Sequence, residues 1–212
     1  MGIFSTGASA ISFLLLFALV IAISVHEFSH ALMGYLEGDN TAKYEGRLTL
    51  NPLAHLDLLG SLMLFFVGFG WGKPVPFNPF NLKHRKWGPT IVALVGPISN
   101  LLVAILAGLV FKILVMFTDL TSDNLLILFL QLLGIVNIGL ALFNLLPIPP
   151  LDGAKLLHTL LPDRFYQLKE NLLLYGPYML LGLLVLERFF KIPLFQGLTT
   201  LTTAIFSFFF LP

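Results

Sequence analysis

Two histidines, His26 and His30, interrupt an apolar stretch that carries no charged side chain before them. Their spacing places both imidazoles on one face of a helix, where they can hold one metal ion. Glu27 lies beside them, in position to take a proton from a metal-bound water. Titratable groups buried in a membrane cost several kcal/mol unless they pair or bind a ligand. The run His26-Glu27-Phe28-Ser29-His30 therefore predicts a metal-dependent hydrolytic site, in preference to a histidine pair that is only hydrogen-bonded within a helix bundle.

A catalytic zinc site usually has three protein ligands and one open position for water. The chain contains no cysteine, so the third ligand must be an acid or a histidine from another segment. Most acids lie in predicted loops or near the ends of apolar spans, whereas Asp152 follows a long uncharged run. An alternative is that Asp152 caps a helix that begins at Gly153. The spacing favours the ligand and leaves the cap open.

The composition indicates the environment in which this site must work. Of the 212 residues, 57% are hydrophobic and 11% are charged, against about 25% charged in soluble domains. The sequence therefore predicts an all-α polytopic membrane protein, with the lipid bilayer as a partner. The net charge of +1 gives no indication of nucleic acid, and none is expected as a partner. No removable signal peptide is recognised, and homo-oligomerisation is left open.

About four to five membrane spans are predicted within one membrane-embedded domain covering residues 1–212. Residues 58–72 are too short to cross and are rich in glycine, which favours a re-entrant or interfacial hairpin. Residues 43–50 favour a short β-strand, with residues 73–79 as an extended edge segment beside it. The predicted spans are residues 8–36, 87–111, 124–146 and, more weakly, 171–186, while residues 192–212 fit either a fifth span or an interfacial helix.

Loop charges predict the orientation of the spans. Residues 37–90 hold six Lys or Arg, whereas the 112–123 connection holds only Lys112. Because cytoplasmic loops are enriched in these residues, we expect a multi-pass protein of the cell membrane with its N-terminus outside. The site formed by His26, His30 and Asp152 then lies toward the cytoplasm.

Several motifs together resemble the site-2 protease family of intramembrane zinc metalloproteases. They are the His26–His30 run, the stretch from Asn144 through Pro147 to Asp152-Gly153, the Gly96-Pro97-Ile98-Ser99-Asn100 segment and the Asn51–Asp57 stretch. The resemblance covers most of residues 10–160, and the hydrophobic segments within 171–212 carry no signature. It implies one Zn²⁺ held by His26, His30 and Asp152, with Glu27 as the catalytic acid and base, in a compact form without a PDZ domain.

The resemblance also implies that Asn144 helps to hold the unwound substrate or its oxyanion. Asn100 lies in an apolar span and fits two roles equally: it faces the site and contacts substrate, or it hydrogen-bonds between helices. His55 lies in a loop, from which it either approaches the site or is solvated, and the solvated position is favoured.

The function predicted is that of an intramembrane zinc endopeptidase, which hydrolyses peptide bonds in or near transmembrane segments of membrane proteins. The strand at residues 43–50 is expected to hold the opened substrate by β-augmentation. Alternatives are a membrane metal transporter, a non-proteolytic scaffold that binds helices, and a zinc enzyme acting on lipids. A transporter needs polar groups along a path across the bilayer, whereas here they cluster at one depth. A scaffold has no need of Glu27.

Overall fold

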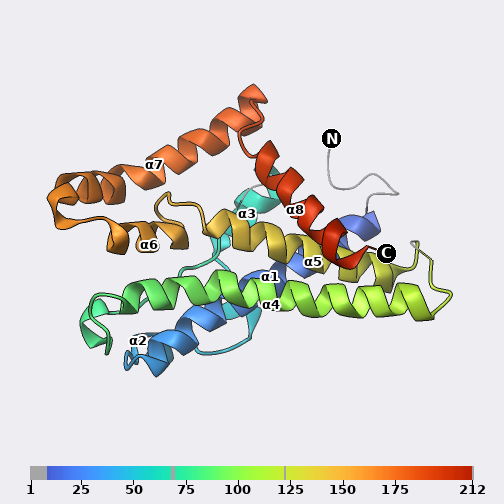
Figure 1. Ribbon diagram of the computed structural model, residues 1–212, viewed down its shortest axis with the longest axis horizontal. Helices are drawn as coiled ribbons and strands as arrows, with labels where there is room; N and C mark the ends of the chain where they lie inside the picture. Colours follow the sequence, from blue (N-terminus) through green and yellow to red (C-terminus); the bar gives the residue numbers. More distant parts are fainter. Residues whose placement is uncertain (1–8, 68–69, 122, 212) are drawn as a thin grey trace.

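Three long helices lie side by side and form the centre of the protein (Figure 1). The computed structural model describes residues 9–67, 70–121 and 123–211. The central helices are α1 (Ser9–Leu36), α4 (Gly88–Phe117) and α5 (Leu125–Asn144). The remaining helices are α2 (Thr41–Tyr44), α3 (Leu58–Val67), α6 (Asp152–Leu160), α7 (Tyr166–Phe190) and α8 (Gln196–Phe210), with short 3₁₀ turns η1 (Pro52–Ala54), η2 (Pro79–Asn81) and η3 (Asp163–Phe165).

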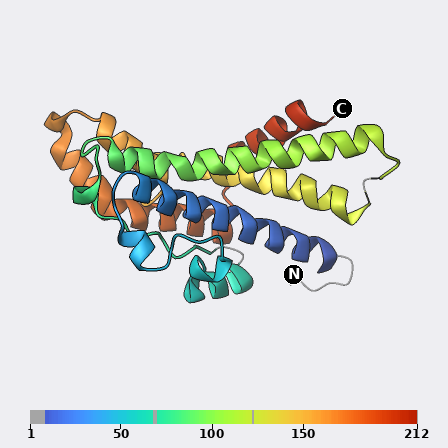
Figure 2. The same ribbon diagram turned by 90° about the horizontal axis from the view of Figure 1, so that it is seen from below.

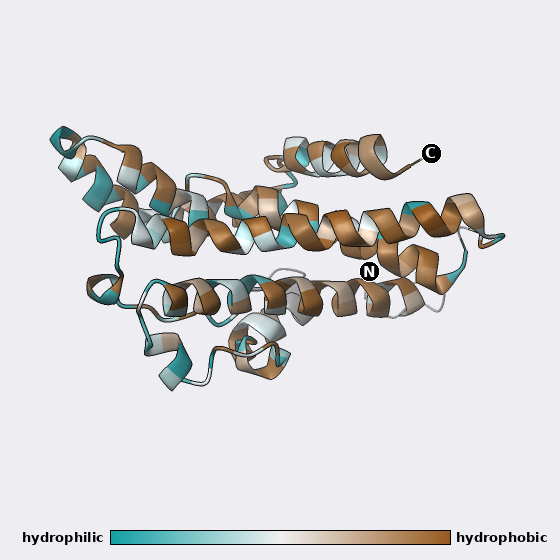
Figure 3. Cartoon of the chain, turned by 60° about the horizontal axis from the view of Figure 1, so that its bottom comes forward, coloured by the Kyte–Doolittle hydropathy of each residue, from teal (hydrophilic) through white to brown (hydrophobic). Residues whose placement is uncertain are grey.

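Among the residues that the structure describes, four helices are long and apolar enough to cross a membrane, namely Ala10–Leu36, Gly88–Phe117, Leu125–Asn144 and Asp163–Phe190. This confirms the prediction of a helical, multi-pass membrane protein. Figure 3 shows the apolar residues along these helices and the hydrophilic ones gathered at the turns. Helix α8 has 15 residues, fewer than the ~20 needed to span, so the fifth apolar segment is not among the candidate spans.

Small residues set how closely the helices approach. Ala18 and Ala22 of α1 and Ala104 of α4 are fully or almost fully buried, as expected where helices pack in a membrane without a hydrophobic driving force. Helix α8 packs on α4 through the Phe210 ring and on α5 through the Phe206 ring. A Cβ placed at Gly134 would lie 2.5 Å from the Phe206 ring, so this glycine makes the recess that α8 occupies.

Helix α7 lies apart from the three central helices. Figure 1 shows it joined to them by α6 at one end and by α8 at the other. Figure 2 shows α1 and α4 running together along the length of the molecule, with α3 on the α1 side. Near its middle, α7 contacts the segment between α5 and α6, where Gly176 packs on the Pro149 ring. A Cβ at Gly176 would lie 2.6 Å from this ring, so glycine allows the close approach.

The strand predicted for residues 43–50 is wrong, and its proposed role in holding substrate goes with it. This segment forms α2 and then a turn at Gly46, which has a φ of +68°. That left-handed conformation suits glycine and reverses the chain before a strand can pair. In the described part of the chain, β-pairing is limited to one isolated antiparallel bridge between Leu56 and Gly72.

The two ends of the segment formed by residues 58–72 lie close together. The segment begins as α3, and it closes at the Leu56–Gly72 bridge and at a hydrogen bond from the Lys73 N–H to the His55 carbonyl (2.8 Å). Residues 68 and 69 of the predicted hairpin lie outside the described residues. Its insertion into the bilayer stays a prediction.

Candidate metal centre

Three side chains from two distant parts of the chain converge on one point. The Nε2 atoms of His26 and His30 lie 3.0 Å apart. The Asp152 Oδ2 atom lies 3.1 Å from the first and 3.2 Å from the second. All three residues are buried. Ligand atoms around a tetrahedral Zn²⁺ ion are about 3.3 Å apart, so the triangle has the size that this ion requires.

The turn between α5 and α6 brings Asp152 to the histidines. Asp152 is the first residue of α6, and Leu151, not Asp152, occupies the N-cap position without a side-chain cap. The carboxylate is therefore not used as a helix cap. A Cβ at Gly153 would lie 2.2 Å from the Leu145 carbonyl oxygen. Only glycine allows α6 to start this close to the end of α5, which explains the Asp-Gly pair.

The hydrogen bonds behind the imidazoles determine which ring nitrogen faces the centre. His30 Nδ1 lies 2.7 Å from the Val92 carbonyl oxygen, which only accepts, so Nδ1 carries the hydrogen and Nε2 presents a lone pair. Asp152 Oδ2 is buried and receives no hydrogen bond from the part of the chain that the structure describes. Acceptor atoms brought this close repel one another unless a cation or a shared proton lies between them. Two imidazoles and one carboxylate are a donor set that suits Zn²⁺.

Gly96 of α4 makes room for both rings. A Cβ at this position would lie 2.4 Å from His30 Cε1, 2.5 Å from His30 Nε2 and 2.7 Å from His26 Cε1. The Gly96-Pro97 pair is thus a packing feature that faces the metal centre directly.

Gly96→Ala is expected to weaken zinc binding by 10-fold or more, on the order of the loss seen when groups that orient metal ligands are removed. The added methyl must displace at least one imidazole from its present position. Zinc affinity measured by competition with a chelator tests this. Gly182→Ala is the matched control, since a Cβ at Gly182 meets nothing within 4 Å. Equal affinities in the two variants would contradict the prediction.

Glu27 lies on α1 between the two ligands and contacts an extended segment, residues 73–78, which we call the strap. Its Oε2 atom accepts a hydrogen bond from the Val75 N–H at 3.2 Å. Glu27 is partly buried, unlike the three ligands. Its carboxylate is outside the ligand triangle.

Two charged side chains hold the strap in place by hydrogen bonds to its backbone. Arg47 is buried and donates hydrogen bonds to the carbonyl oxygens of Lys73 and Pro74. Asp39 is also buried and accepts from the Asn78 N–H (2.6 Å) and from the Asn81 side chain (2.9 Å). The segments at 43–50 and 73–79 thus meet as predicted neighbours, but through side chains and not through a β-ladder.

Asp39→Asn is expected to destabilise the fold by about 1–3 kcal/mol. The NH₂ group of the asparagine would face N–H groups that now donate to the Asp39 carboxylate, and those N–H groups would lose their acceptor. Burial disfavours the charge, yet the hydrogen bonds from Thr41, Asn81 and Asn78 hold the pKa of the Asp39 carboxyl below its usual range. Its contribution to stability is therefore present above the unfolded-state pKa and lost as the pH falls through the folded-state pKa. Thermal unfolding in detergent, with Glu45→Gln as an exposed control, measures the difference; equal melting temperatures would contradict it.

The other predicted site residues lie outside the ligand triangle. Asn144 ends α5, and its amide donates to the Leu140 carbonyl at 3.0 Å. Asn100 is fully buried, and its Oδ1 lies 2.6 Å from His26 Nδ1, so it both faces the centre and bonds between helices. The expectation of a solvated His55 is wrong: the ring is fully buried, with Nε2 2.7 Å from the Thr49 carbonyl oxygen.

Two further residues near the site were missed from the sequence. Lys155 lies one helical turn after Asp152, and its ammonium is 3.8 Å from Asp152 Oδ1, on the carboxylate oxygen that does not face the histidines. Asn137 on α5 is fully buried and contacts Asn100. An amide in the middle of an apolar span was the signal that could have identified Asn137, as it did Asn100.

Comparison with known proteins places these features in a family context. A family model described as Peptidase family M50 matches residues 111–184, a range that includes Asp152. A Bacillus subtilis (strain 168) protein named "Putative zinc metalloprotease YwhC" is 37% identical over 156 residues, covering 70% of this chain and 69% of its own. No solved structure matches this chain.

Two mycobacterial proteins described in the same words, both named Rip2, are also similar. The one from Mycolicibacterium smegmatis is 32% identical over 158 residues, covering 68% of this chain and 57% of its own. The one from Mycobacterium tuberculosis (strain H37Rv) is 34% identical over 143 residues, covering 63% and 52%. The chain thus spans little more than half the length of these two relatives.

Proposed function

Since this chain belongs to Peptidase family M50, and is thereby a zinc metalloprotease with membrane-spanning helices, we propose that it cleaves peptide bonds within or next to transmembrane segments of other membrane proteins. The observation that carries the proposal is the buried triangle of His26, His30 and Asp152 on helices of membrane-spanning character. Zinc, when bound there, supplies a Lewis acid that polarises the scissile carbonyl and acidifies water.

In this proposal Glu27 moves the proton. Its carboxylate accepts the proton of the attacking water as a general base and later delivers it to the leaving amine as a general acid. The position of Glu27 supports both steps, because it follows His26 directly and is less buried than the ligands.

Asn144 is proposed to hold the substrate backbone. One amide hydrogen is used by the Leu140 carbonyl, which leaves Oδ1 and a second hydrogen for a peptide. A substrate helix must unwind before its carbonyls become available, because they are engaged in its own hydrogen bonds. An amide presents both a donor and an acceptor to such an opened backbone.

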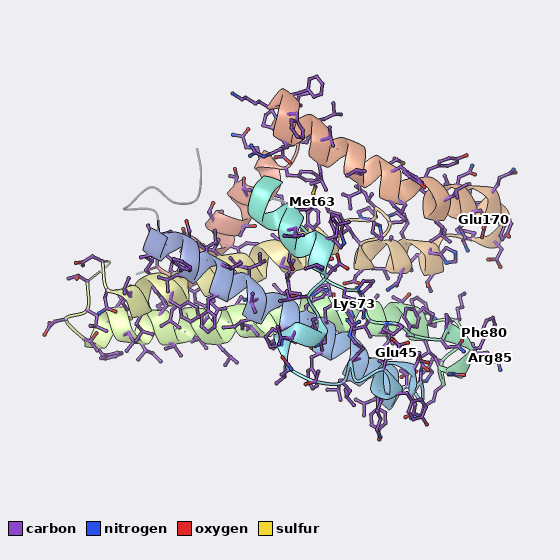
Figure 4. All side chains as sticks on the ribbon, turned by 180° about the vertical axis from the view of Figure 1, so that it is seen from behind. Glu45, Met63, Lys73, Phe80, Arg85 and Glu170 are labelled. Atoms are coloured by element: carbon purple, nitrogen blue, oxygen red, sulfur yellow. The ribbon has the colours of Figure 1, made fainter. Side chains whose placement is uncertain are left out.

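The site is proposed to face the cytoplasm, with the N-terminus outside. Lys83, Arg85 and Lys86 precede α4 and lie at the end of the bundle where α1 finishes, since Lys83 Nζ donates to the Leu36 carbonyl at 2.7 Å. Figure 4 shows Glu45, Arg85 and Glu170 at this same end. Concentrated basic residues there fit the positive-inside rule.

Introduced cysteines test this orientation cleanly, because the chain has none of its own. A membrane-impermeant maleimide added to intact cells is expected to label Thr121→Cys, in the turn between α4 and α5, and to label Lys86→Cys only after permeabilisation. Labelling in the reverse order would overturn the orientation and leave the peptidase proposal intact.

Cleavage-site mapping tests the substrate class. Purified protein in detergent with zinc is given single-span substrates, each paired with a control whose span is replaced by polyleucine. Mass spectrometry is expected to place the cuts within or beside the natural span, and the polyleucine partners are expected to be cut more slowly because their helices unwind less readily. Cuts confined to soluble flanking sequence, at equal rates in both partners, would reject cleavage of transmembrane segments.

A further inference from the structure

The structure places a second buried amide, Asn137 of α5, behind the contact between Asn100 and His26. We propose that Asn137 is a positioning residue for the metal centre: it fixes the orientation of the Asn100 amide and, through it, the tautomer of His26. The proposal rests on the zinc site and not on peptidase activity, so the two can fail separately.

The contacts form one continuous relay across three helices. Asn137 Nδ2 donates to the Leu133 carbonyl at 2.8 Å. Asn100 Nδ2 donates to Asn137 Oδ1 at 2.8 Å and to the Ala22 carbonyl of α1 at 3.0 Å. Asn100 Oδ1 then faces His26 Nδ1 at 2.6 Å. Both asparagines are fully buried, so water does not substitute for any of these partners.

Two backbone carbonyls decide which way each amide points. A carbonyl only accepts, so the NH₂ group of Asn137 must face Leu133 and the NH₂ group of Asn100 must face Ala22. The Asn100 oxygen is therefore left for His26, whose Nδ1 must carry the hydrogen. The Nε2 lone pair then points at His30 and Asp152, as a metal ligand requires.

The relay provides His26 Nδ1 with a hydrogen-bond acceptor of fixed orientation, as the Val92 carbonyl does for His30 Nδ1. His30 Nδ1 bonds directly to the Val92 oxygen, whose acceptor character cannot change. Without Asn137, the Ala22 carbonyl would be the one acceptor among these contacts that keeps the Asn100 NH₂ group turned away from His26. Asn137 adds a second acceptor on the NH₂ side, so that turning the Asn100 amide would set two oxygens against each other. A buried amide that served only to hold helices together would not need to end at a metal ligand.

Cobalt binding to the purified protein provides the test, because Co²⁺ reports coordination through its visible absorption. Asn137→Leu is expected to weaken Co²⁺ affinity by roughly 10–100-fold, the range for groups that orient metal ligands, and to alter the absorption bands. Gln131→Leu is the matched control, an amide on the same helix outside the relay. If Asn137→Leu does not fold, Asn137→Ser takes its place, since a serine hydroxyl is too short to reach Asn100.

A double-mutant cycle separates positioning from helix packing. If Asn137 acts through Asn100, the variant carrying both Asn100→Leu and Asn137→Leu should bind Co²⁺ about as weakly as Asn100→Leu alone. Losses that multiply in the double variant would overturn the proposal. So would an Asn137→Leu protein with a lower melting temperature but the Co²⁺ affinity and spectrum of the Gln131→Leu control.

Discussion

Glu27→Gln is expected to lower the rate of peptide-bond cleavage by roughly 10²–10⁴-fold, the contribution of a positioned general acid–base, and to leave zinc bound. Glutamine keeps the volume of the side chain but cannot take a proton from water. The Glu27 carboxylate does not contribute to the ligand triangle, and among the described residues it accepts one hydrogen bond, from the Val75 N–H. That contact can be kept by the glutamine oxygen, so the strap should stay in place.

The measurement pairs cleavage of a single-span substrate with zinc content of the same preparation. Glu45→Gln is the control, because Glu45 is an exposed glutamate at the end of α2 and its loss should change neither quantity. Identical fragments at identical rates from wild type and Glu27→Gln would separate the peptidase activity from this site. A fall in activity accompanied by loss of zinc would mean that Glu27 supports the metal and would leave its proton-transfer role without support.

The three candidate ligands could be singled out from the sequence because a membrane makes ionisable residues rare. His26 and His30 share a helix face at their spacing whatever the rest of the chain does. Asp152 could be selected because few acids lie outside predicted loops. The structure adds that the Asp152 carboxylate points at both imidazoles and leaves the N-terminus of α6 uncapped by a side chain, which periodicity alone left open.

The structure of the polar region that follows α1, which includes α2 and the strap, could not be predicted in the same way. Its fold depends on long-range contacts between single side chains and backbone atoms, such as those of Arg47 with residues 73–74 and of Asp39 with Asn78. Local alternation over residues 43–50 favoured a strand, but one glycine at positive φ outweighs it. His55 was misjudged for a related reason, because burial of a loop histidine depends on a partner, the Thr49 carbonyl, that no spacing reveals.

Asp152→Asn is expected to remove zinc binding, with a loss of affinity beyond the 10–100-fold range of residues that only orient ligands, while the fold is kept. The Asp152 Oδ2 atom is buried, lies 3.1 and 3.2 Å from two imidazole nitrogens, and receives no hydrogen bond from the described residues. An asparagine NH₂ group in that place donates to an imidazole and relieves the repulsion. The metal-free variant should therefore be at least as stable as metal-free wild type.

Thermal unfolding with and without zinc distinguishes these effects. A ligand that binds only the folded state stabilises it by about 2.7 kcal/mol at a concentration of 100 times its Kd, so zinc should raise the melting temperature of wild type. The same zinc concentration should leave the melting temperature of Asp152→Asn unchanged. Asp163→Asn, which alters an exposed carboxylate paired with Lys169, should respond to zinc as wild type does. An Asp152→Asn protein with full zinc content would exclude Asp152 as the third ligand, and the buried pair His26 and His30 would then require a different partner.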